Sequence, residues 1–293
     1  MSRCLVTGHL GYIGSKVYAA LKEQGHEVLG IDYRDDPRRD VSKLLKEDAD
    51  GRFHPVYERF KPEYIFHLAC IPRVEYSVEY PVATMINNVI QTSHILNFAR
   101  KVGSRRVIYS GSSSVVGNGH GPESPYGLQK LISEMECELY SKLYGVDTVT
   151  LRYFNVYSPC QKANDAYATA IANWMHFIKT GRSPFITGDG NQRRDMAHIE
   201  DIVSANIFAM EYADQFMGRN YDVGTGNNIS LNEVKDIVLE YHPHVEFEYR
   251  PPRSGDVLET KADIAPLRAI GWSPSVPIRD GIKECFDFKL QGE

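Results

Sequence analysis

The sequence lacks the features that mark a disulfide-bonded, zinc-binding or membrane-spanning protein. Its five cysteines are odd in number, widely scattered and without a Cys-x-x-Cys pair, so we expect buried, reduced thiols and no bound metal. They are Cys4, Cys70, Cys137, Cys160 and Cys285. No stretch approaches the roughly 20 apolar residues that a membrane span requires, and the N-terminus enters a strand pattern without a cleavage site. These absences favour a cytoplasmic protein.

An excess of basic residues is also missing. The 33 Lys and Arg residues against 38 Asp and Glu residues give a formal net charge of −5. A protein with this balance has no basic surface for a nucleic acid or an anionic membrane. We therefore expect neither as a partner, and any anionic ligand must be held by a local site.

Short apolar runs alternate with helical stretches over the first half of the chain. The predicted strands are residues 3–7, 27–31, 64–68, 106–110 and 147–151, and the main predicted helices are 12–24, 82–102 and 126–144. This alternation predicts an α/β fold with a doubly wound parallel sheet of the Rossmann type.

The regular alternation weakens after residue 156, where Pro, Gly and aromatic residues separate shorter elements. We expect residues 1–155 to form the dinucleotide-binding domain. Residues 196–210 again suggest a strand and a helix, so 196–226 are expected to rejoin that domain. Residues 156–195 and 227–293 would then form a smaller C-terminal α/β lobe that binds the substrate.

Three glycines, Gly8, Gly11 and Gly14, stand between the first predicted strand and its helix. Glycine at this turn lets a pyrophosphate approach the backbone and meet the helix N-terminal amides. Asp32 ends the second predicted strand, where a carboxylate accepts hydrogen bonds from both adenosine ribose hydroxyls and repels a 2′-phosphate. The pattern favours NAD as cofactor, although Arg34 leaves accommodation of that phosphate open.

Tyr126 and Lys130 form a Tyr-x-x-x-Lys pair on one face of a predicted helix. The ordinary pKa of tyrosine, about 10, is too high for a base near neutrality, and an adjacent ammonium together with a positive nicotinamide ring lowers it. The serine run at 110–114 follows a predicted strand and should lie at the carboxyl end of the sheet, where open α/β folds bind ligands.

With these motifs in order, the chain resembles the extended short-chain dehydrogenases/reductases and, within them, the NAD-dependent UDP-sugar 4-epimerases. The resemblance covers nearly the whole chain. It rests on T-G-x-x-G-x-x-G at 7–14, His67-Leu68-Ala69, Val74-x-x-Ser77-x-x-x-Pro81, Asn88-Val89, Ser112, Tyr126/Lys130, L-R-Y-F-N-V-Y at 151–157, G-D-G-N-Q-R-R-D at 188–195, Val223-Gly224-Thr225-Gly226 and R-S-G-D at 253–256.

The resemblance assigns roles to individual residues. It implies that NAD is bound by Gly8, Gly11, Tyr12, Ile13, Gly14, Asp32, Asp40, Leu68, Ala69, Asn88, Tyr126 and Lys130. It implies catalysis by Ser112, Tyr126 and Lys130, and binding of the nucleotide sugar by Ser112, Ser113, Asn155, Arg194, Arg253, Asp256 and Thr260. A surface ion pair between Arg194 and Asp195 is the alternative for that pair. Relatives pair through the two long helices, so a homodimer is expected.

The residues after Ser112 favour one reaction. Related dehydratases carry an Asp-Glu pair there, and decarboxylases keep a glutamate, whereas this chain has Ser113 and Ser114. Without a carboxylate, abstraction and return of a hydride is the chemistry best supported. We therefore expect 4-epimerisation of a UDP-hexose or UDP-N-acetylhexosamine through a transient 4-keto sugar. Tyr126 would take the proton of the 4-hydroxyl with a hydrogen bond from Ser112.

Two further positions concern the substrate. In relatives a tyrosine at the position of Thr260 closes the pocket, so threonine predicts that N-acetylated sugars are accepted. The segment between Gly117 and Tyr126 is shorter than in relatives, which implies a more open site. The alternatives are an NAD(P)-dependent reductase or another modifying enzyme of a nucleotide sugar and, ranked last, a non-catalytic dinucleotide-binding regulator.

Overall fold

The computed structural model describes residues 1–34, 47–48, 50–163, 169–252 and 257–288. Contacts divide the chain into two units, each formed by two separate segments. Unit 1 comprises Met1–Arg152 and Val203–Tyr221, and unit 2 comprises Tyr153–Ile202 and Asp222–Glu293. The division predicted from the sequence, with residues 1–155 and 196–226 together, stays a prediction.

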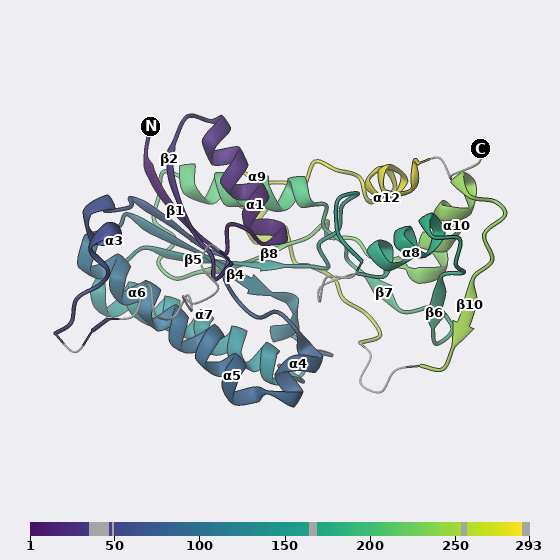
Figure 1. Ribbon diagram of the computed structural model, residues 1–293, viewed down its shortest axis with the longest axis horizontal. Coiled ribbons are helices and arrows are strands. Elements are labelled where there is room, and N and C mark those ends of the chain that lie inside the picture. Colours follow the sequence, from purple (N-terminus) through teal and green to yellow (C-terminus); the bar gives the residue numbers. More distant parts are fainter. Residues whose placement is uncertain (35–46, 49, 164–168, 253–256, 289–293) are drawn as a thin grey trace. The chain divides into compact units, whose positions relative to one another are not determined.

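A six-stranded sheet forms the centre of unit 1 (Figure 1). Its strands are β1 (Arg3–Thr7), β2 (Glu27–Ile31), β3 (Tyr64–His67), β4 (Arg106–Ser112), β5 (Thr148–Tyr153) and β8 (Asn220–Val223), in the order β2-β1-β3-β4-β5-β8. β1 pairs in parallel with β2 and β3, and β3 pairs in parallel with β4. Thr7 lies opposite both Ile31 and His67, so these strands end together.

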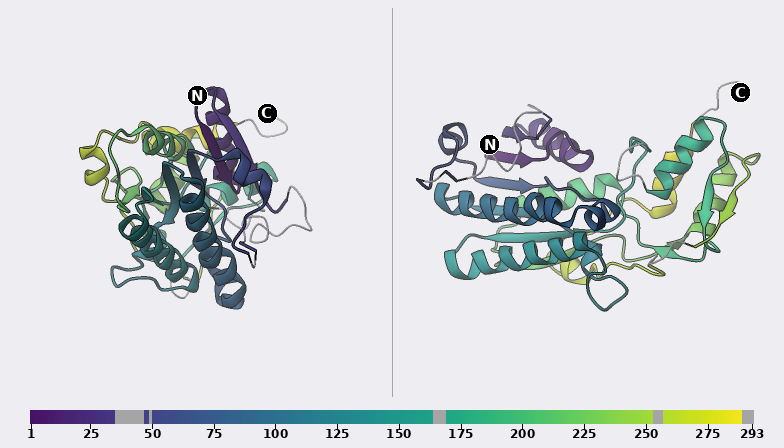
Figure 2. Two further views of the ribbon diagram at one scale, coloured as in Figure 1. Left: turned by 90° about the vertical axis from the view of Figure 1, so that its left-hand side faces the viewer. Right: turned by 60° about the horizontal axis from the view of Figure 1, so that its bottom comes forward.

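Helices lie on both faces of this sheet, with α1 and α9 on one face and α6 and α7 on the other (Figure 1). The helices are α1 (Tyr12–Glu23), α3 (Pro55–Phe60), α4 (Val74–Glu79), α5 (Pro81–Met85), the π-helical turn η1 (Ile86–Ile90), α6 (Gln91–Val102), the 3₁₀ turn η2 (Ser113–Val115), α7 (Pro125–Tyr144) and α9 (Ile199–Glu211). α6 and α7 lie side by side (Figures 1 and 2). The doubly wound fold predicted from the sequence is confirmed.

The predicted continuous helix over 82–102 is wrong in its middle, where η1 interrupts the α-helical hydrogen bonding. The hydroxyls of Thr92 and Ser93 donate to the carbonyls of Asn88 and Val89, four residues earlier. Such side-chain bonds compete with the backbone ladder. Single π turns are rare and often occur at functional sites, and this one carries Asn88.

The core of unit 1 lies between the sheet and α6. Leu5, Ile65 and Val107 are neighbours in the register of β1, β3 and β4, and all three are fully buried. They belong to one apolar cluster with Ile95 and Phe98 of α6. Burial of each such side chain contributes about 1.5–3 kcal/mol, so this cluster fixes the strands whose ends carry the predicted site.

Unit 2 has short strands and separate helices. Its elements are α8 (Ala170–Lys179), β6 (Phe185–Thr187), β7 (Arg193–Arg194), β9 (Ile229–Ser230), α10 (Leu231–Tyr241), β10 (Glu248–Arg250), α11 (Ala265–Ala269) and α12 (Ile278–Phe286). β6 pairs in parallel with β10, and β7 pairs antiparallel with β9. Trp174, Val238 and Ile282, from α8, α10 and α12, share its core. Unit 2 thus contains both helices and strands, and its role as the substrate-binding lobe stays a prediction.

The structure tests what the sequence predicts for the strand near residue 196, the cysteines and membrane-spanning helices. The strand expected before the helix near 196–210 is reduced to one bridge between Tyr157 and His198. The prediction of five buried thiols is wrong for Cys160, which is exposed, and for Cys70, which is partly exposed. Across the described ranges, no helix combines the length and apolar character needed to cross a membrane.

Candidate active site

The glycine loop of unit 1 is built for close approach to its backbone. Gly8 has a φ of 73°, and its N–H donates to the carbonyl of Ile31 at 2.7 Å, which ties the loop to β2. A Cβ on Gly14 would lie 2.0 Å from the Gly8 carbonyl oxygen. Gly11 precedes α1 and gives its first turn no side-chain cap. The N-terminal amides of α1 therefore suit a pyrophosphate.

Asp32 follows β2 and is almost completely buried. Its carboxylate accepts the backbone N–H of Leu10 at 3.2 Å and the Nε of Arg34 at 3.0 Å. Burial raises the pKa of Asp32, but the hydrogen bonds and charge of Arg34 outweigh it, and the net pKa is lowered. The ionised carboxylate fits ribose hydroxyls, which would compete with the guanidinium for the same oxygens.

His67, at the end of β3, connects Thr7, the residue before the glycine loop, to Thr92 of α6. Its Nδ1 is 2.8 Å from the Thr7 hydroxyl, and its Nε2 is 3.0 Å from the Thr92 hydroxyl. Thr7 also accepts the N–H of Ala69, and Thr92 donates to the carbonyl of Asn88. Burial, and then the charge of Lys130, lower the pKa of His67 to about 3. His67 is therefore a neutral structural link.

Asn88 holds the chain that follows β3. Its Oδ1 accepts the N–H of Ile71 at 2.8 Å, and its Nδ2 donates to the Ile71 carbonyl and to Oε1 of Gln129. With Ala69 bonded to Thr7, the segment 69–71 is fixed at both ends. The side chain of Asn88 thus acts on the loop, and direct binding of the cofactor by Asn88, Leu68 and Ala69 stays a prediction.

The predicted Tyr126–Lys130 pair is buried at the start of α7. Ser124 caps the helix by accepting the N–H of Gly127, and Pro125 occupies its first turn. The N–H of Tyr126 donates to the Ser77 hydroxyl at 3.0 Å. Lys130 is 1% exposed, and its Nζ donates to the Ser110 carbonyl at 2.6 Å and lies 6.0 Å from the centre of the Tyr126 ring.

The electrostatics of this pair are a balance between burial and charge. Burial raises the pKa of Tyr126 well above its ordinary value, and Lys130 and a hydrogen bond with Ser112 lower it only in part. Lys130 therefore acts in the predicted direction without sufficing alone. Burial lowers the pKa of Lys130, but Cys70 and Tyr126 outweigh it and the net pKa is raised, so the lysine keeps its charge.

Ser112 and its neighbours form a hydroxyl cluster at the end of β4. The Ser112 side chain caps η2 by accepting the N–H of Ser114 at 3.2 Å. Its hydroxyl also lies 3.1 Å from the Ser114 hydroxyl. Ser113 is half-buried on the same turn. The serine run is thus a structured turn at the carboxyl end of a central strand, as its position in the sequence predicts.

Cys70 is a neighbour of this pair that the sequence did not reveal. Its thiol lies close enough to Lys130 and to Tyr126 to influence the ionisation of both. The fixed segment 69–71 explains this placement. The three residues after a strand carry no signal of which side chain turns toward a lysine 60 positions later in the chain.

Unit 2 is organised around a buried carboxylate, that of Asp195. It is 0% exposed and accepts the N–H and hydroxyl of Thr225 at 2.8 Å, the N–H of Gly226 at 2.9 Å and the N–H of Ala262 at 3.1 Å. Burial raises the pKa of Asp195 in spite of these bonds. The alternative of a surface ion pair between Arg194 and Asp195 is therefore wrong.

Asn155 and Thr260 meet beside this hub. Asn155 has a φ of 35°, in the left-handed region that asparagine tolerates better than most residues. Its Nδ2 donates to the Asp195 carbonyl at 2.6 Å and to Oγ1 of Thr260 at 3.2 Å. Because a carbonyl only accepts hydrogen bonds, the amide nitrogen must face Asp195. Oδ1 of Asn155 is left as an acceptor, which suits a ligand hydroxyl better than a phosphate.

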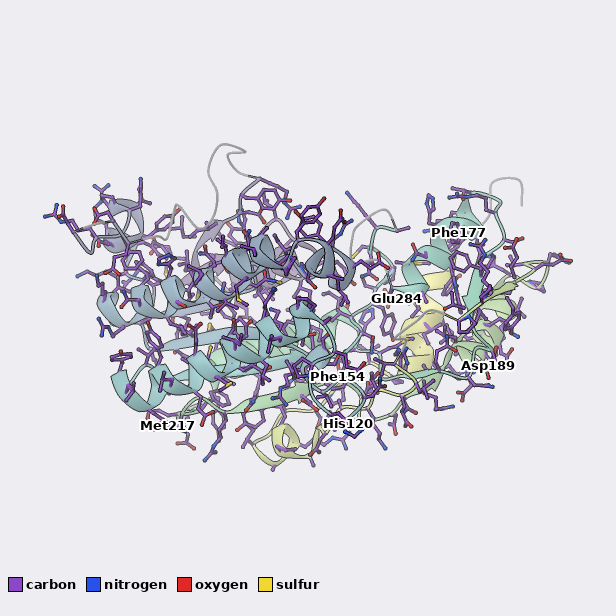
Figure 3. All side chains as sticks on the ribbon, turned by 90° about the horizontal axis from the view of Figure 1, so that it is seen from below. His120, Phe154, Phe177, Asp189, Met217 and Glu284 are labelled. Carbon is purple, nitrogen blue, oxygen red and sulfur yellow. The ribbon has the colours of Figure 1, made fainter. Side chains whose placement is uncertain are left out.

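A cleft of about 200 Å³ within unit 2 is bordered by Asn155 and Arg194. Its apolar walls include Trp174, Phe177 and Phe185 (Figure 3 labels Phe177 on α8). The indole N–H of Trp174 donates to the Phe185 carbonyl at 2.9 Å, so the ring is fixed. Aromatic walls beside one guanidinium suit a flat ring attached to phosphate.

The predicted site residues thus fall into two groups. Unit 1 brings together the glycine loop, Asp32, Ser112, Tyr126 and Lys130, and unit 2 brings together Asn155, Arg194 and Thr260. Tyr12 and Ile13 lie in the first turn of α1, next to the loop. Asp40, Arg253 and Asp256 lie outside the described residues, and their roles stay predictions.

A Rossmann sheet with a glycine loop after its first strand and a buried Tyr-x-x-x-Lys pair defines a dinucleotide-dependent enzyme class. The family model described as "NAD dependent epimerase/dehydratase family" matches residues 4–224, and the chain belongs to this family. The match confirms the predicted family and its NAD dependence.

The full-length relatives point to nucleotide sugars. The chain is 32% identical over 309 residues, 98% of each chain, to a UDP-glucose 4-epimerase from Mycolicibacterium smegmatis. It resembles the structure of the Thermotoga maritima UDP-glucose 4-epimerase with UDP-glucose (TM-score 0.86, 29% identity, 97% of both chains). A UDP-N-acetylglucosamine 4-epimerase from Methanobrevibacter ruminantium, in complex with UDP-N-acetylmuramic acid, is similar (TM-score 0.85, 29% identity, 97% of both chains).

The relatives do not share a single reaction. A UDP-N-acetyl-alpha-D-glucosaminuronate decarboxylase from Bacillus cytotoxicus is 28% identical over 96% of both chains. Membership of the family therefore defines an NAD-dependent enzyme and leaves the reaction to be argued from the site.

Proposed function

We propose that this chain is an NAD-dependent 4-epimerase of a nucleotide-activated sugar, a UDP-hexose or a UDP-N-acetylhexosamine, acting through a transient 4-keto sugar. The observation that carries the proposal is the buried Tyr126 with Lys130 and Ser112, followed by Ser113 and Ser114 where a dehydratase would need carboxylic acids. A site with one proton-transfer group suits oxidation and reduction at a single carbon.

The residues of unit 1 would carry out the proton transfer. Tyr126 takes the proton of the sugar 4-hydroxyl on its phenol oxygen and returns it when the ketone is reduced. Lys130, bonded to the Ser110 carbonyl, holds its ammonium near the phenol. Bound NAD supplies the hydride acceptor and a positive ring that adds to Lys130 in lowering the tyrosine pKa. A hydrogen bond from Ser112 would favour the ionised phenol.

The residues of unit 2 would hold the nucleotide. Arg194 donates to the diphosphate as a guanidinium fork, and the aromatic walls of the cleft, among them Phe177 and Phe185, contact the base. Asn155 accepts a hydroxyl through Oδ1, because its nitrogen is bonded to Asp195 and Thr260. Arg253 and Asp256 are proposed as further nucleotide ligands from the resemblance. UDP is favoured because the solved relatives bind UDP-sugars.

Thr260 is proposed to admit N-acetylated sugars. Because its hydroxyl also accepts a hydrogen bond from Asn155, the test must separate the size of the side chain from this bond. Thr260→Tyr should reduce turnover of UDP-N-acetylglucosamine more than that of UDP-glucose. Since the substitution also changes the bond to Asn155, Thr260→Ser and Thr260→Val serve as small controls with and without that hydroxyl. An equal loss for both sugars in Thr260→Tyr would contradict the role in substrate size.

A homodimer is part of this proposal, because unit 1 exposes an apolar stripe. Val82, Ile86 and Ile90 follow one another at four-residue spacing, and Met135, Leu139 and Leu143 do so on α7, which packs on α5, η1 and α6. Such a stripe on adjacent helices suits a second copy. Leu139→Glu should shift the mass from dimer to monomer in light scattering, and a wild-type monomer would contradict it. The cytoplasmic location expected from the sequence also belongs to the proposal.

The test of the function is to incubate the purified protein with UDP-glucose and with UDP-N-acetylglucosamine and to identify products by NMR. The proposal expects the 4-epimers without consumption of added NADH. Stoichiometric oxidation of NADH with a 4-keto sugar nucleotide would favour a reductase. Release of NAD on denaturation with no turnover of any sugar nucleotide would favour a regulator.

A further inference from the structure

Three hydroxyls form a chain beside Lys130: those of Tyr126, Ser112 and Ser114. Ser112 lies near enough to the Tyr126 phenol for a hydrogen bond between them to help lower the pKa of the tyrosine. The Ser112 hydroxyl lies 3.1 Å from that of Ser114, whose backbone N–H also donates to the Ser112 oxygen at 3.2 Å. Ser114 has no role in the proton transfer described above.

The placement of Ser114 relative to Tyr126 is fixed by backbone contacts. A Cβ on Gly127, the residue after Tyr126, would lie 2.5 Å from the Ser114 carbonyl oxygen. The first turn of α7 therefore packs directly on η2. Because Ser112 caps η2 and Ser124 caps α7, both ends of the hydroxyl chain are held by hydrogen-bonded turns.

The number of hydrogens on these three hydroxyls determines the direction of each hydrogen bond between them. A serine hydroxyl has one hydrogen to donate and two lone pairs to accept with, and the Ser114 N–H already uses one lone pair of Ser112. When Tyr126 is protonated, the phenol donates to Ser112 and Ser112 donates to Ser114. When Tyr126 is a phenolate, Ser112 must donate to it instead. Ser114 can then turn and donate to Ser112.

We propose that Ser114 is a positioning residue for Tyr126, whose hydroxyl accepts from Ser112 when the phenol is protonated and donates to Ser112 when the phenol has lost its proton. The inference rests on the proposed function, because it assigns Tyr126 the proton transfer. The bond that Ser114 donates to Ser112 in the phenolate state is stronger than the bond that it accepts in the protonated state. Hydrogen bonds that point in sequence toward a charge reinforce one another. Ser114 therefore favours the phenolate.

The test compares Ser114→Ala with a matched pair of similar shape, Ser114→Thr and Ser114→Val. Loss of the hydroxyl in the Ala and Val variants should move the acidic limb of the pH profile of kcat/KM to higher pH by about half a unit, the effect of one hydrogen bond. Ser114→Thr should restore the wild-type profile. Val116→Ala, a change on the exposed side of the same loop, should leave it unchanged.

A second readout does not depend on the sugar. The ionisation of Tyr126 in the NAD-bound protein can be followed by ultraviolet difference absorbance against Tyr126→Phe, and the same shift is expected there. An unshifted titration in Ser114→Val, or a shift to lower pH, overturns the role of Ser114. A wild-type protein that titrates as expected but turns over no sugar nucleotide contradicts the proposed function instead.

Discussion

The two units hold their site residues by different means. In unit 1 the glycine loop, Asp32 and Ser112 follow or end parallel strands, and Tyr126 and Lys130 share one long helix. In unit 2 Asn155, Arg194 and Thr260 lie on short bridges and loops around the carboxylate of Asp195. Regular elements position the first set, whereas one buried hydrogen-bonding hub positions the second. A single substitution should therefore damage unit 2 more broadly than unit 1.

The largest effect is expected at the hub itself. Asp195→Asn replaces one acceptor oxygen by a donor that faces backbone N–H groups, which leaves buried donors unpaired. We expect a loss of about 3 kcal/mol in the free energy of unfolding, measured by chemical denaturation. Binding of UDP should weaken while NAD binding persists below the transition. Equal loss of both ligands under native conditions would remove the distinction between the units.

The counterpart in unit 1 is the glycine loop. A side chain at Gly14 meets the Gly8 carbonyl at 2.0 Å, so Gly14→Ala must displace the loop. We expect roughly 100-fold lower activity because the cofactor is misplaced. NAD should also bind more weakly, which calorimetry measures. Gly103→Ala is the control for the added methyl group, because nothing lies within 4 Å of its Cβ and its φ of 72° adds a backbone strain that Gly14, inside α1, does not have. Unchanged NAD affinity in Gly14→Ala would refute the assignment of the loop.

His67 gives unit 1 a dependence on pH that can be tested. Its pKa is about 3 in the folded protein and about 6.5 in an unfolded chain. Between these values the unfolded state binds the additional proton, so stability falls as the pH falls below about 6.5. The loss should reach about 2 kcal/mol at pH 5. His67→Asn should flatten this part of the stability curve, and an unchanged slope would mean that other groups cause it.

The smallest effect concerns the choice of cofactor. Asp32→Asn removes the charge that repels a 2′-phosphate and frees the guanidinium of Arg34 from its ion pair. We expect NAD to bind about tenfold more weakly, through loss of one charged hydrogen bond, and NADP to gain. Fluorescence titration with both cofactors measures the ratio. If Asp32→Asn keeps the wild-type preference for NAD over NADP, the adenosine ribose does not bind at Asp32.

These contrasts explain what the sequence could predict. The turn of Gly8, Gly11 and Gly14 was predictable from its place between a strand and a helix, and the pairing of Tyr126 with Lys130 from their spacing along one helix. The same regularity predicted the sheet. The π-helical turn at 86–90 was not predictable, since it arises where side-chain hydroxyls compete for carbonyls within an otherwise helical pattern.

Unit 2 was less predictable for a physical reason. Adjacent Arg194 and Asp195 carry the same signal whether they form a surface ion pair or, as here, a buried hub. The N–H groups that donate to Asp195 belong to residues 225, 226 and 262, and no local sequence pattern connects these residues with Asp195. Likewise, only the folded chain shows that the nitrogen of Asn155 is already bonded and that Cys70 lies near enough to Lys130 to raise its pKa.

The central claim is that Tyr126 permits oxidation of a sugar at carbon 4 and return of the same hydrogen to the opposite face. The most direct measurement follows UDP-galactose deuterated at carbon 4 through the reaction by NMR. The account predicts UDP-glucose that keeps its deuterium at carbon 4, and no product from Tyr126→Phe. Product with hydrogen from solvent or from added NADH at that carbon, or undiminished turnover by Tyr126→Phe, would contradict it.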